Sequence, residues 1–351
     1  MKKRLTLVLE WKKNKALKFI LLPLALFYWG MVSCRNLFYS RGFFISKKLP
    51  TKIISVGNIT VGGTGKTPAA VFIVKALSEK GIKCAVLSRG YGRKTAGTQL
   101  VTDGITPVLD WRNYGDEPSL LAKLLPGVPI VVDSKRHRGG MFLVENFKPD
   151  IIILDDAFQH RSIERDLDIV LINSKDKKTD HKLLPYGLLR EPLSSLRRAN
   201  VLIFTKTNLT QPDQLLVQMA KSTKLPVLSS TLDIIGLTSF DGRPTSIKKG
   251  TKAVALSAIA DTSGFIKTIE DFGINVIKHF DFADHHSFKQ SEVDQISSQM
   301  ERLDSEIIIT TEKDMVKIAN LEVGLLKVYS IDVSFNLPEK DKKTLLKLIQ
   351  N

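Results

Sequence analysis

The chain has 351 residues, of which 43% are apolar, so it is long enough for two domains with a sizeable core in each. Its net charge is +16, but residues 1–48 hold eleven lysines and arginines against the single acid Glu10, a net of +10 that leaves only +6 for the rest. A nucleic-acid-binding protein would more often carry its basic residues on a folded face, so we expect no nucleic-acid partner. The two cysteines, Cys34 and Cys84, match no metal-ligand spacing and indicate a reducing compartment.

The first predicted element is a helix in the apolar segment 19–34. Such a helix spans roughly 24 Å, less than the roughly 30 Å of a bilayer core, and Pro23 weakens it further. Tyr28 and Trp29 suit the headgroup boundary, and lysines flank the segment on both sides. We therefore expect residues 1–48 to form a basic, membrane-associated region that inserts partly into an anionic surface, with both ends on the cytoplasmic side. A true span, a cleaved signal and an ordinary buried helix are the alternatives.

A strand predicted at 52–56 runs into a glycine-rich turn and then into a helix. Glycines allow successive backbone N–H groups to point at phosphate oxygens, a lysine can reach the β- and γ-phosphates, and a threonine hydroxyl can hold Mg²⁺. The positive end of the following helix favours the same anion. The usual pattern has a glycine where this chain has Thr60, so Gly62 and Gly63 are expected to supply the turn. The alternative is a strand–helix turn that binds nothing. We predict ATP binding by Thr60, Val61, Gly62, Gly63, Thr64, Gly65, Lys66 and Thr67.

The pattern of strand, loop and helix repeats along the rest of the chain. Apolar runs recur at 84–88, 129–132, 151–154, 168–172 and 201–204, with amphipathic stretches such as 67–79 and 117–125 between them. This alternation predicts an α/β fold of the P-loop NTPase type, a parallel sheet with helices on both faces. A second, smaller α/β set follows, with strands at 226–229, 253–257, 275–280 and 306–310 and helices at 262–272 and 289–302. We place the core at 49–210, the second domain at 211–335 and a C-terminal helix at 336–351.

Several charged residues stand where predicted strands end or helices begin. Asp155 and Asp156 follow an apolar strand, where a phosphate-loop enzyme places its second Mg²⁺ ligand, although they could also cap a turn. Arg89, between a serine and a glycine at another strand end, can reach a phosphate, but a surface arginine in a tight turn explains it equally well. Asp116 lies at a probable helix start, where carboxylates also serve as caps. The neighbouring pair His285 and His286 has no third metal ligand in register and is more often simply solvated.

Seven motifs, in this order along the chain, resemble the tetraacyldisaccharide 4′-kinase family, the lipid A 4′-kinases of Gram-negative bacteria. They are Val-Gly-Asn-Ile-Thr-Val-Gly-Gly-Thr-Gly-Lys-Thr-Pro at 56–68, Ser-Arg-Gly-Tyr-Gly at 88–92, Gly-Asp-Glu-Pro at 115–118, Asp-Asp-Ala-Phe-Gln-His at 155–160, Leu-Arg-Glu-Pro at 189–192, Asp-His-His at 284–286 and Thr-Glu-Lys-Asp at 311–314. Taken singly, only the phosphate loop is specific. The likeness extends from the apolar helix to about residue 317, and Thr60 is shared with that family's loop.

The resemblance implies a kinase that moves the γ-phosphoryl group of ATP to the 4′-hydroxyl of a tetraacylated glucosamine disaccharide 1-phosphate, a step of lipid A biosynthesis at the cytoplasmic face of the bacterial inner membrane. In that family a carboxylate–histidine pair activates the hydroxyl, and the matching positions are Asp116 and His285. Which of the two takes the proton stays open, and His286 is the rival histidine. Arg89 and Arg138 are candidates for contacting a phosphate. The implied Mg²⁺ ligands are Thr67, Asp155, Asp156 and Glu191.

Two other classes of protein compete with this interpretation. The phosphate loop would also suit an ATPase or GTPase that acts as a membrane-associated switch, although the guanine-binding sequence Asn-Lys-x-Asp has only a weak echo at 205–208. The other is a non-catalytic basic protein that binds membranes or nucleic acid, and the clustering of the excess charge in residues 1–48 tells against nucleic acid as its target. We expect a monomer whose partners are the lipid A precursor and an anionic membrane surface.

Overall fold

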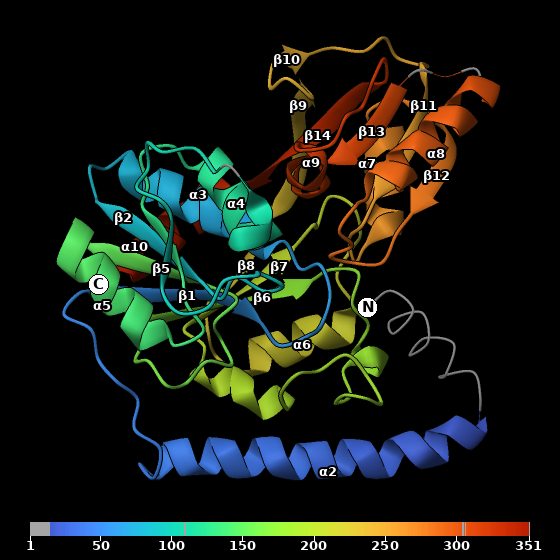
Figure 1. Ribbon diagram of the computed structural model, residues 1–351. Helices are drawn as coiled ribbons and strands as arrows, with labels where there is room; N and C mark the ends of the chain where they lie inside the picture. Colours follow the sequence, from blue (N-terminus) through green and yellow to red (C-terminus); the bar gives the residue numbers. More distant parts are fainter. Residues whose placement is uncertain (1–14, 109, 304, 306, 351) are drawn as a thin grey trace.

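The computed structural model describes residues 15–350 apart from 109, 304 and 306, and it consists of two α/β lobes and a long N-terminal helix (Figure 1). The first fourteen residues of the basic region predicted at 1–48 lie outside this part of the chain. The helix, α2 (Lys15–Ser40), runs along the side of the first lobe that lies farthest from the second (Figure 1). The second lobe and α2 thus lie at opposite ends of the molecule, with the first lobe between them.

The first lobe is built on an eight-stranded sheet in the order β3-β4-β2-β5-β1-β6-β7-β8, in which only the edge strand β3 runs antiparallel. Most of its central strands are buried along their whole length, which is why the sequence shows them as unbroken apolar runs. The strands are β1 (Lys52–Asn58), β2 (Cys84–Ser88), β3 (Gln99–Thr102), β4 (Ile130–Val132), β5 (Ile151–Asp155), β6 (Leu167–Asn173), β7 (Val201–Thr205) and β8 (Val227–Ser229).

Helices cover both faces of this sheet, as the sequence predicts. On one face α3 (Lys66–Ser78) and α4 (Asp116–Leu124) pack on residues such as Ile54 and Val86, and on the other α5 (Arg136–Phe147) and α6 (Gln214–Ser222) pack on residues such as Ile152 and Val170. Alternate residues of each strand thus point to opposite faces of the sheet and pack in the hydrophobic core on that face. Short 3₁₀ turns complete the lobe at Trp111–Asn113, Lys178–Asp180 and Leu193–Arg198.

The second lobe has a six-stranded sheet in the order β10-β9-β14-β13-β11-β12. Its strands are β9 (Thr231–Ser239), β10 (Pro244–Thr245), β11 (Lys252–Ser257), β12 (Asn275–Asp281), β13 (Ile307–Thr311) and β14 (Lys327–Asn336). Helix α7 (Thr262–Asp271) covers one face, and α8 (Gln290–Arg302) and α9 (Glu312–Ile318) cover the other. The long antiparallel pair β9 and β14 carries the chain into this lobe and back out of it, so it links the two halves.

The boundary between the lobes differs from the one predicted after residue 210. Strand β8, predicted as part of the second domain, pairs in parallel with β7 as the last strand of the first sheet. The C-terminal helix α10 (Glu339–Gln350) also returns to the first lobe, where Leu345, Leu346 and Ile349 join its core. The alternation of strands and helices continues unbroken through α6 and β8, so the sequence gives no sign of the true boundary.

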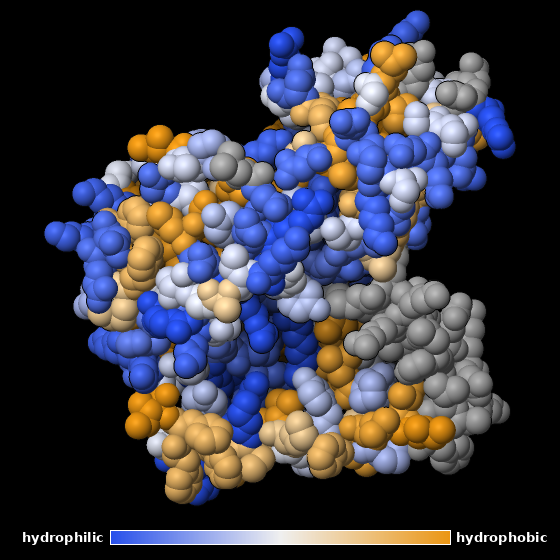
Figure 2. All heavy atoms as spheres, in the orientation of Figure 1, coloured by the Kyte–Doolittle hydropathy of each residue, from blue (hydrophilic) through white to orange (hydrophobic). Residues whose placement is uncertain are grey.

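Helix α2 (Lys15–Ser40) is longer than the predicted segment 19–34 and continues through Pro23. Leu21, Ala25 and Val32 are buried against the first lobe. The other sides of the helix expose large apolar side chains, which gather along the lower edge in Figure 2; they include Ile20, Leu24, Leu26, Phe27, Trp29 and Met31. Within the described part of the chain, α2 is the one helix long and apolar enough to cross a membrane.

Candidate active site

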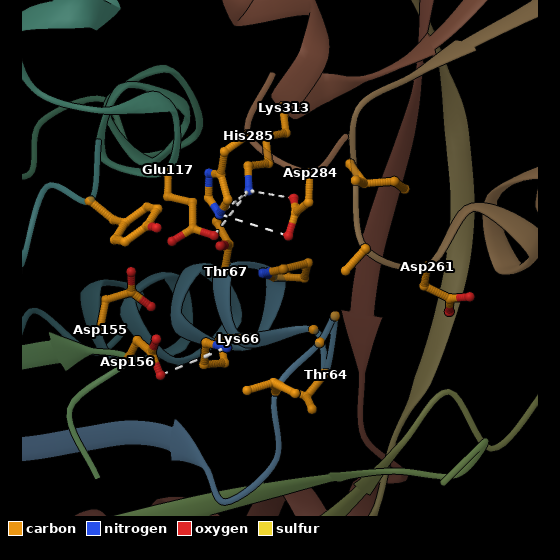
Figure 3. A pocket seen from close by; sticks show the side chains of 18 of the residues that line it. Thr64, Lys66, Thr67, Glu117, Asp155, Asp156, Asp261, Asp284, His285 and Lys313 are labelled. Carbon is orange, nitrogen blue, oxygen red and sulfur yellow. Dashed lines mark hydrogen bonds and ion pairs between the residues drawn. The ribbon is translucent and has the colours of Figure 1, made fainter. Parts of the chain in front are cut away.

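A cavity of about 730 Å³ lies between the two lobes. The phosphate loop and the ends of β2 and β5 form its wall on the first lobe, and the segments around 259–268, 284–285 and 311–313 form the opposing wall (Figure 3). At one end the cavity reaches Tyr28 and Arg35 of α2. Residues that are more than 200 positions apart in the sequence thus share one site at the carboxyl ends of the parallel strands, where such folds bind their ligands.

The phosphate loop joins β1 to α3 in the conformation that its glycines permit. Gly62 and Gly65 have φ angles of 119° and 79°, and a Cβ at either position would meet no neighbouring atom, so glycine is needed there for the backbone angle alone. The loop carbonyls are held from the next strands: Asn173 Nδ2 donates to Gly63 O (3.1 Å) and Thr205 Oγ1 to Thr64 O (3.0 Å). The loop therefore has a fixed shape at the start of α3, whose positive end favours an anion.

The two acids after β5 occupy different environments. Asp156 Oδ1 lies 3.7 Å from Lys66 Nζ, and both its carboxylate oxygens accept from Arg190 Nη1 at 2.9 and 3.0 Å. Asp155 is buried; Oδ2 accepts from Ser88 Oγ at 3.3 Å, whereas Oδ1 has no hydrogen-bond partner among the described residues. Burial, followed by repulsion from Glu117 and Asp156, raises the pKa of Asp155 to about 7. A cation placed beside this carboxylate would relieve both effects.

These residues fit the predicted Mg²⁺ site. No group of three or more His, Cys, Asp or Glu side chains in the described part of the chain is arranged to hold a metal ion, but Mg²⁺ usually takes one or two carboxylates and completes its shell with phosphate and water. Asp155 supplies an unpartnered oxygen, and Asp156 and Thr67 line the same cavity. Glu191 does not join them: it is fully buried outside the cavity, and its carboxylate pairs with Arg35 and with Arg198 (2.6 Å). We therefore leave Glu191 out of this site.

Asp116 and His285, which the sequence pairs only through the family resemblance, form a hydrogen-bonded pair across the cleft. His285 Nδ1 lies 2.9 and 3.1 Å from the two carboxylate oxygens of Asp116. Asp116 is the first residue of α4, and it follows Gly115, whose φ is 101° and where a Cβ would come within 2.8 Å of a backbone oxygen. His285 and Lys313 line the cavity (Figure 3), whereas Asp116 is 3% exposed and is not among the lining residues.

Lys313 of α9 lies among three carboxylates and His285. Its Nζ lies 3.1 Å from Glu117, 3.6 Å from Asp116, 3.8 Å from Asp284 and 3.4 Å from His285 Nε2. Burial alone would lower the pKa of Lys313, but the three carboxylates outweigh it and raise that pKa. Burial alone would likewise raise the pKa of Asp116, but the His285 hydrogen bond and the Lys313 charge hold it well below its usual range. Both groups therefore stay charged. The motif Thr-Glu-Lys-Asp at 311–314 belongs to the family resemblance, but nothing in the sequence predicts this role for Lys313.

The rival histidine lies elsewhere. His286 Nε2 is 2.9 Å from Glu292 at the start of α8, and its ring stacks on Phe282 at a centroid distance of 4.8 Å. It does not line the cavity. Of the two adjacent histidines, His285 is therefore the one that the fold places at the site.

The arginines correspond only in part to those predicted. Arg89 lines the cavity, but Arg138 is half-exposed outside it and forms a bidentate pair with Asp133 (2.7 and 2.9 Å). The same helix presents Arg136 instead, which is 2% exposed and lines the cavity, and whose Nε has no hydrogen-bond partner among the described residues. Burial, the largest effect, lowers the pKa of Arg136 to about 10, and burial with the surrounding arginines lowers that of His160 to about 4. The structure thus concentrates positive charge between the phosphate loop and α2.

The second lobe contributes an apolar wall beside the half-buried acid Glu312. Its apolar residues are Ile259, Phe265, Ile331 and Val333. Glu312 accepts from Val333 N at 3.4 Å, and burial followed by repulsion from Asp332 raises its pKa to about 7. An apolar wall in the same cavity as the phosphate loop suits the base of a nucleotide.

We expect Glu312→Gln to stabilise the protein at alkaline pH. The folded protein holds the proton of Glu312 up to about pH 7, whereas the unfolded chain releases it near its ordinary pKa, so stability falls as the pH rises between these two values. Glutamine cannot ionise, so the variant does not lose stability over this pH range. Its melting temperature should match the wild type at pH 4.5 and exceed it by a few degrees at pH 8. Glu339→Gln, an exposed acid of α10, is the control; equal shifts in both variants would contradict the assignment.

Comparison with known proteins gives one consistent answer. The family model described as tetraacyldisaccharide-1-P 4′-kinase, LpxK, matches residues 17–350. The tetraacyldisaccharide 4′-kinase of Chlorobaculum parvum is 40% identical over 88% of this chain and 86% of its own, and that of Aquifex aeolicus is 36% identical over 94% and 97%. A crystal structure of Aquifex aeolicus LpxK, an "apo" form in complex with ATP, has a TM-score of 0.77 and 33% identity and covers 95% of this chain and 98% of its own.

Proposed function

The chain belongs to the tetraacyldisaccharide-1-P 4′-kinase family, and from this premise we propose that it transfers the γ-phosphoryl group of ATP to the 4′-hydroxyl of a tetraacylated glucosamine disaccharide 1-phosphate. The family and the enzyme class expected from the seven motifs are confirmed. The observation that carries the proposal for this chain is the Asp116–His285 pair, whose histidine lines the same cavity as the phosphate-loop lysine Lys66. A phosphate-binding loop facing a candidate base is what transfer to a hydroxyl requires.

We assign the triphosphate to the loop at 60–67 and to Lys66, which begins α3. Thr67, Asp155 and Asp156 would hold Mg²⁺, which when bound would neutralise charge on the transferred and leaving phosphates. The high pKa of Asp155 means that this carboxylate is partly protonated near neutral pH until positive charge is placed beside it. The apolar compartment of the second lobe would take the base of ATP.

We infer that His285, and not Asp116, accepts the proton of the acceptor hydroxyl. His285 lines the cavity, and Asp116 lies behind it. The lowered pKa of Asp116 makes that carboxylate a weak base. When the Nδ1–H of His285 donates to Asp116, Nε2 is the ring nitrogen with a lone pair that can accept the proton. As the hydroxyl oxygen bonds to the γ-phosphorus, its proton passes to Nε2 and ADP leaves with the electrons of the broken P–O bond. Lys313 keeps Asp116 and its neighbouring acids in place.

The acceptor would lie between the dyad and α2. Arg89 and Arg136 offer a site for its own phosphate, and the exposed apolar face of α2 suits contact with the acyl chains and the membrane. Tyr28 donates to Arg190 O (2.8 Å) and Arg161 Nη1 to Asn36 O (2.9 Å), so both halves of α2 are fixed to the first lobe. A helix held in this way lies along the membrane surface, and the kinase lobes would then be on the cytoplasmic side, where ATP is available.

Incubation of the purified protein with ATP, Mg²⁺ and the disaccharide 1-phosphate in detergent micelles tests the proposal. We expect stoichiometric formation of ADP and a product that carries one further phosphate, both abolished by EDTA. Replacement of ATP by GTP separates the kinase from a GTPase switch. ADP formation that is independent of the lipid acceptor, or a preference for GTP without a phosphorylated product, would contradict the proposal.

A further inference from the structure

A second set of polar contacts crosses the cleft, at the side of the phosphate loop away from the catalytic pair. Asp261 of the second lobe is the N-cap of α7 and pairs with two lysines of the first lobe. Lys175 Nζ lies 2.8 Å from Asp261 Oδ1, and Lys206 Nζ lies 3.1 Å from Asp261 Oδ2. A Cβ at Gly63 of the phosphate loop would lie 3.7 Å from the Asp261 Cβ, so the second lobe comes close to the loop at this point. Figure 3 labels Asp261 in this cavity.

Lys206 connects this contact to the phosphate loop itself. Its Nζ donates both to Asp261 and to Gly63 O, the latter at 3.1 Å, and Gly63 O also accepts from Asn173 Nδ2. Lys206 follows β7 with a φ of 61°, an unusual angle for a residue other than glycine. Lys175 is placed by its backbone N–H, which donates to Asn173 Oδ1 at 3.1 Å. One carboxylate of the second lobe is therefore bound through two lysines to the strand ends that hold the loop.

We infer that Asp261, through Lys175 and Lys206, is a positioning residue for the proposed kinase reaction that fixes the closure of the second lobe on the phosphate loop. His285 belongs to the same lobe as Asp261, and Asp116 belongs to the same lobe as the loop. The contacts at Asp261 therefore set the lobe position at which the base meets its carboxylate and the nucleotide compartment meets the loop. The inference rests on the proposed function for its kinetic consequence, but the contact itself can be measured without any acceptor.

Asp261→Asn separates positioning from folding. Asparagine is as good an N-cap as aspartate, so its side-chain oxygen can still accept from Gly264 N, at 3.1 Å in the wild type, and α7 should persist. The two ion pairs are lost. We expect the KM for ATP to rise about tenfold, as for a loss of one charged contact, with a smaller fall in kcat. Hydrogen exchange of the peptide that contains residues 60–67 should become faster in the absence of ligand, with the melting temperature little changed.

Two further variants make the result decisive. Lys175→Met removes one partner from a half-exposed position and should shift the KM in the same direction by a smaller factor, and in combination with Asp261→Asn it should add little. Asp271→Asn removes an equal charge from the exposed end of the same helix and should change neither quantity. A KM within twofold of the wild type and unchanged loop exchange in Asp261→Asn would overturn the inference. A wild-type protein without kinase activity would instead refute the proposed function, because the exchange experiment would still report on the contact.

Discussion

Lys66→Ala is expected to lower kcat by on the order of 10³-fold or more, because the reaction needs positive charge where the γ-phosphoryl group departs. Lys66 begins α3 directly after the left-handed Gly65, which fixes where its side chain starts. Its Nζ is 3.7 Å from Asp156, a carboxylate already held by Arg190. The variant therefore leaves Asp156 with a partner and should fold. Turnover is measured as phosphorylated lipid, and folding as the melting temperature.

Lys75→Ala is the matched control for Lys66→Ala. Lys75 lies in the last turn of the same helix and is exposed, so its loss changes the charge of α3 by the same amount away from the cavity. We expect its kcat to stay within twofold of the wild type. Turnover in Lys66→Ala close to that of Lys75→Ala would remove the loop from the mechanism and with it the assignment of the triphosphate.

The sequence predicts the first lobe well because its strands are buried on both faces. Runs such as 151–154 contain no polar residue, so they are clearly predicted as buried strands. They match strands in the structure almost residue by residue. Strands β9 and β14 were missed for the opposite reason. Most residues of β9 are only partly buried, because it joins the lobes, so its sequence has neither a continuous apolar run nor a clear alternation. Because β9 is not predicted and the alternation of strands and helices continues through β8, the predicted domain boundary lies too early in the chain.

The site is less predictable because its residues meet only through tertiary structure. Asp116 and His285 are 169 positions apart and were paired by family resemblance, since neither sequence spacing nor local pattern joins them. Arg136 and Arg138 are two positions apart on α5, and residues so spaced point in different directions, so the choice between them needs the packing of that helix. Asp261 is an ordinary helix N-cap by its sequence, so no role at the site is predicted for it. The fold brings it to the phosphate loop.

Asp116→Ala and His285→Ala are each expected to lower kcat by about 10²- to 10⁴-fold and to leave ATP binding nearly unchanged, because they act on the acceptor proton. The two effects should not add. His285 depends on Asp116 for its orientation, so the double variant should be about as slow as the slower single variant. Single-turnover rates and nucleotide affinity, measured separately, distinguish the chemical step from binding.

The two single variants also decide which residue takes the proton. If His285 is the base, Asp116→Asn should retain more activity than His285→Ala, because an amide oxygen can still accept from Nδ1–H and orient the ring, although it no longer offsets the charge that the ring acquires. His286→Ala is the control; it loses the pair with Glu292 and the stacking on Phe282, both outside the cavity, and we expect its kcat to remain near that of the wild type. A greater loss in Asp116→Asn than in His285→Ala would make Asp116 the proton acceptor, and a collapse of ATP affinity in either Asp116 variant would make Asp116 part of the nucleotide or metal site.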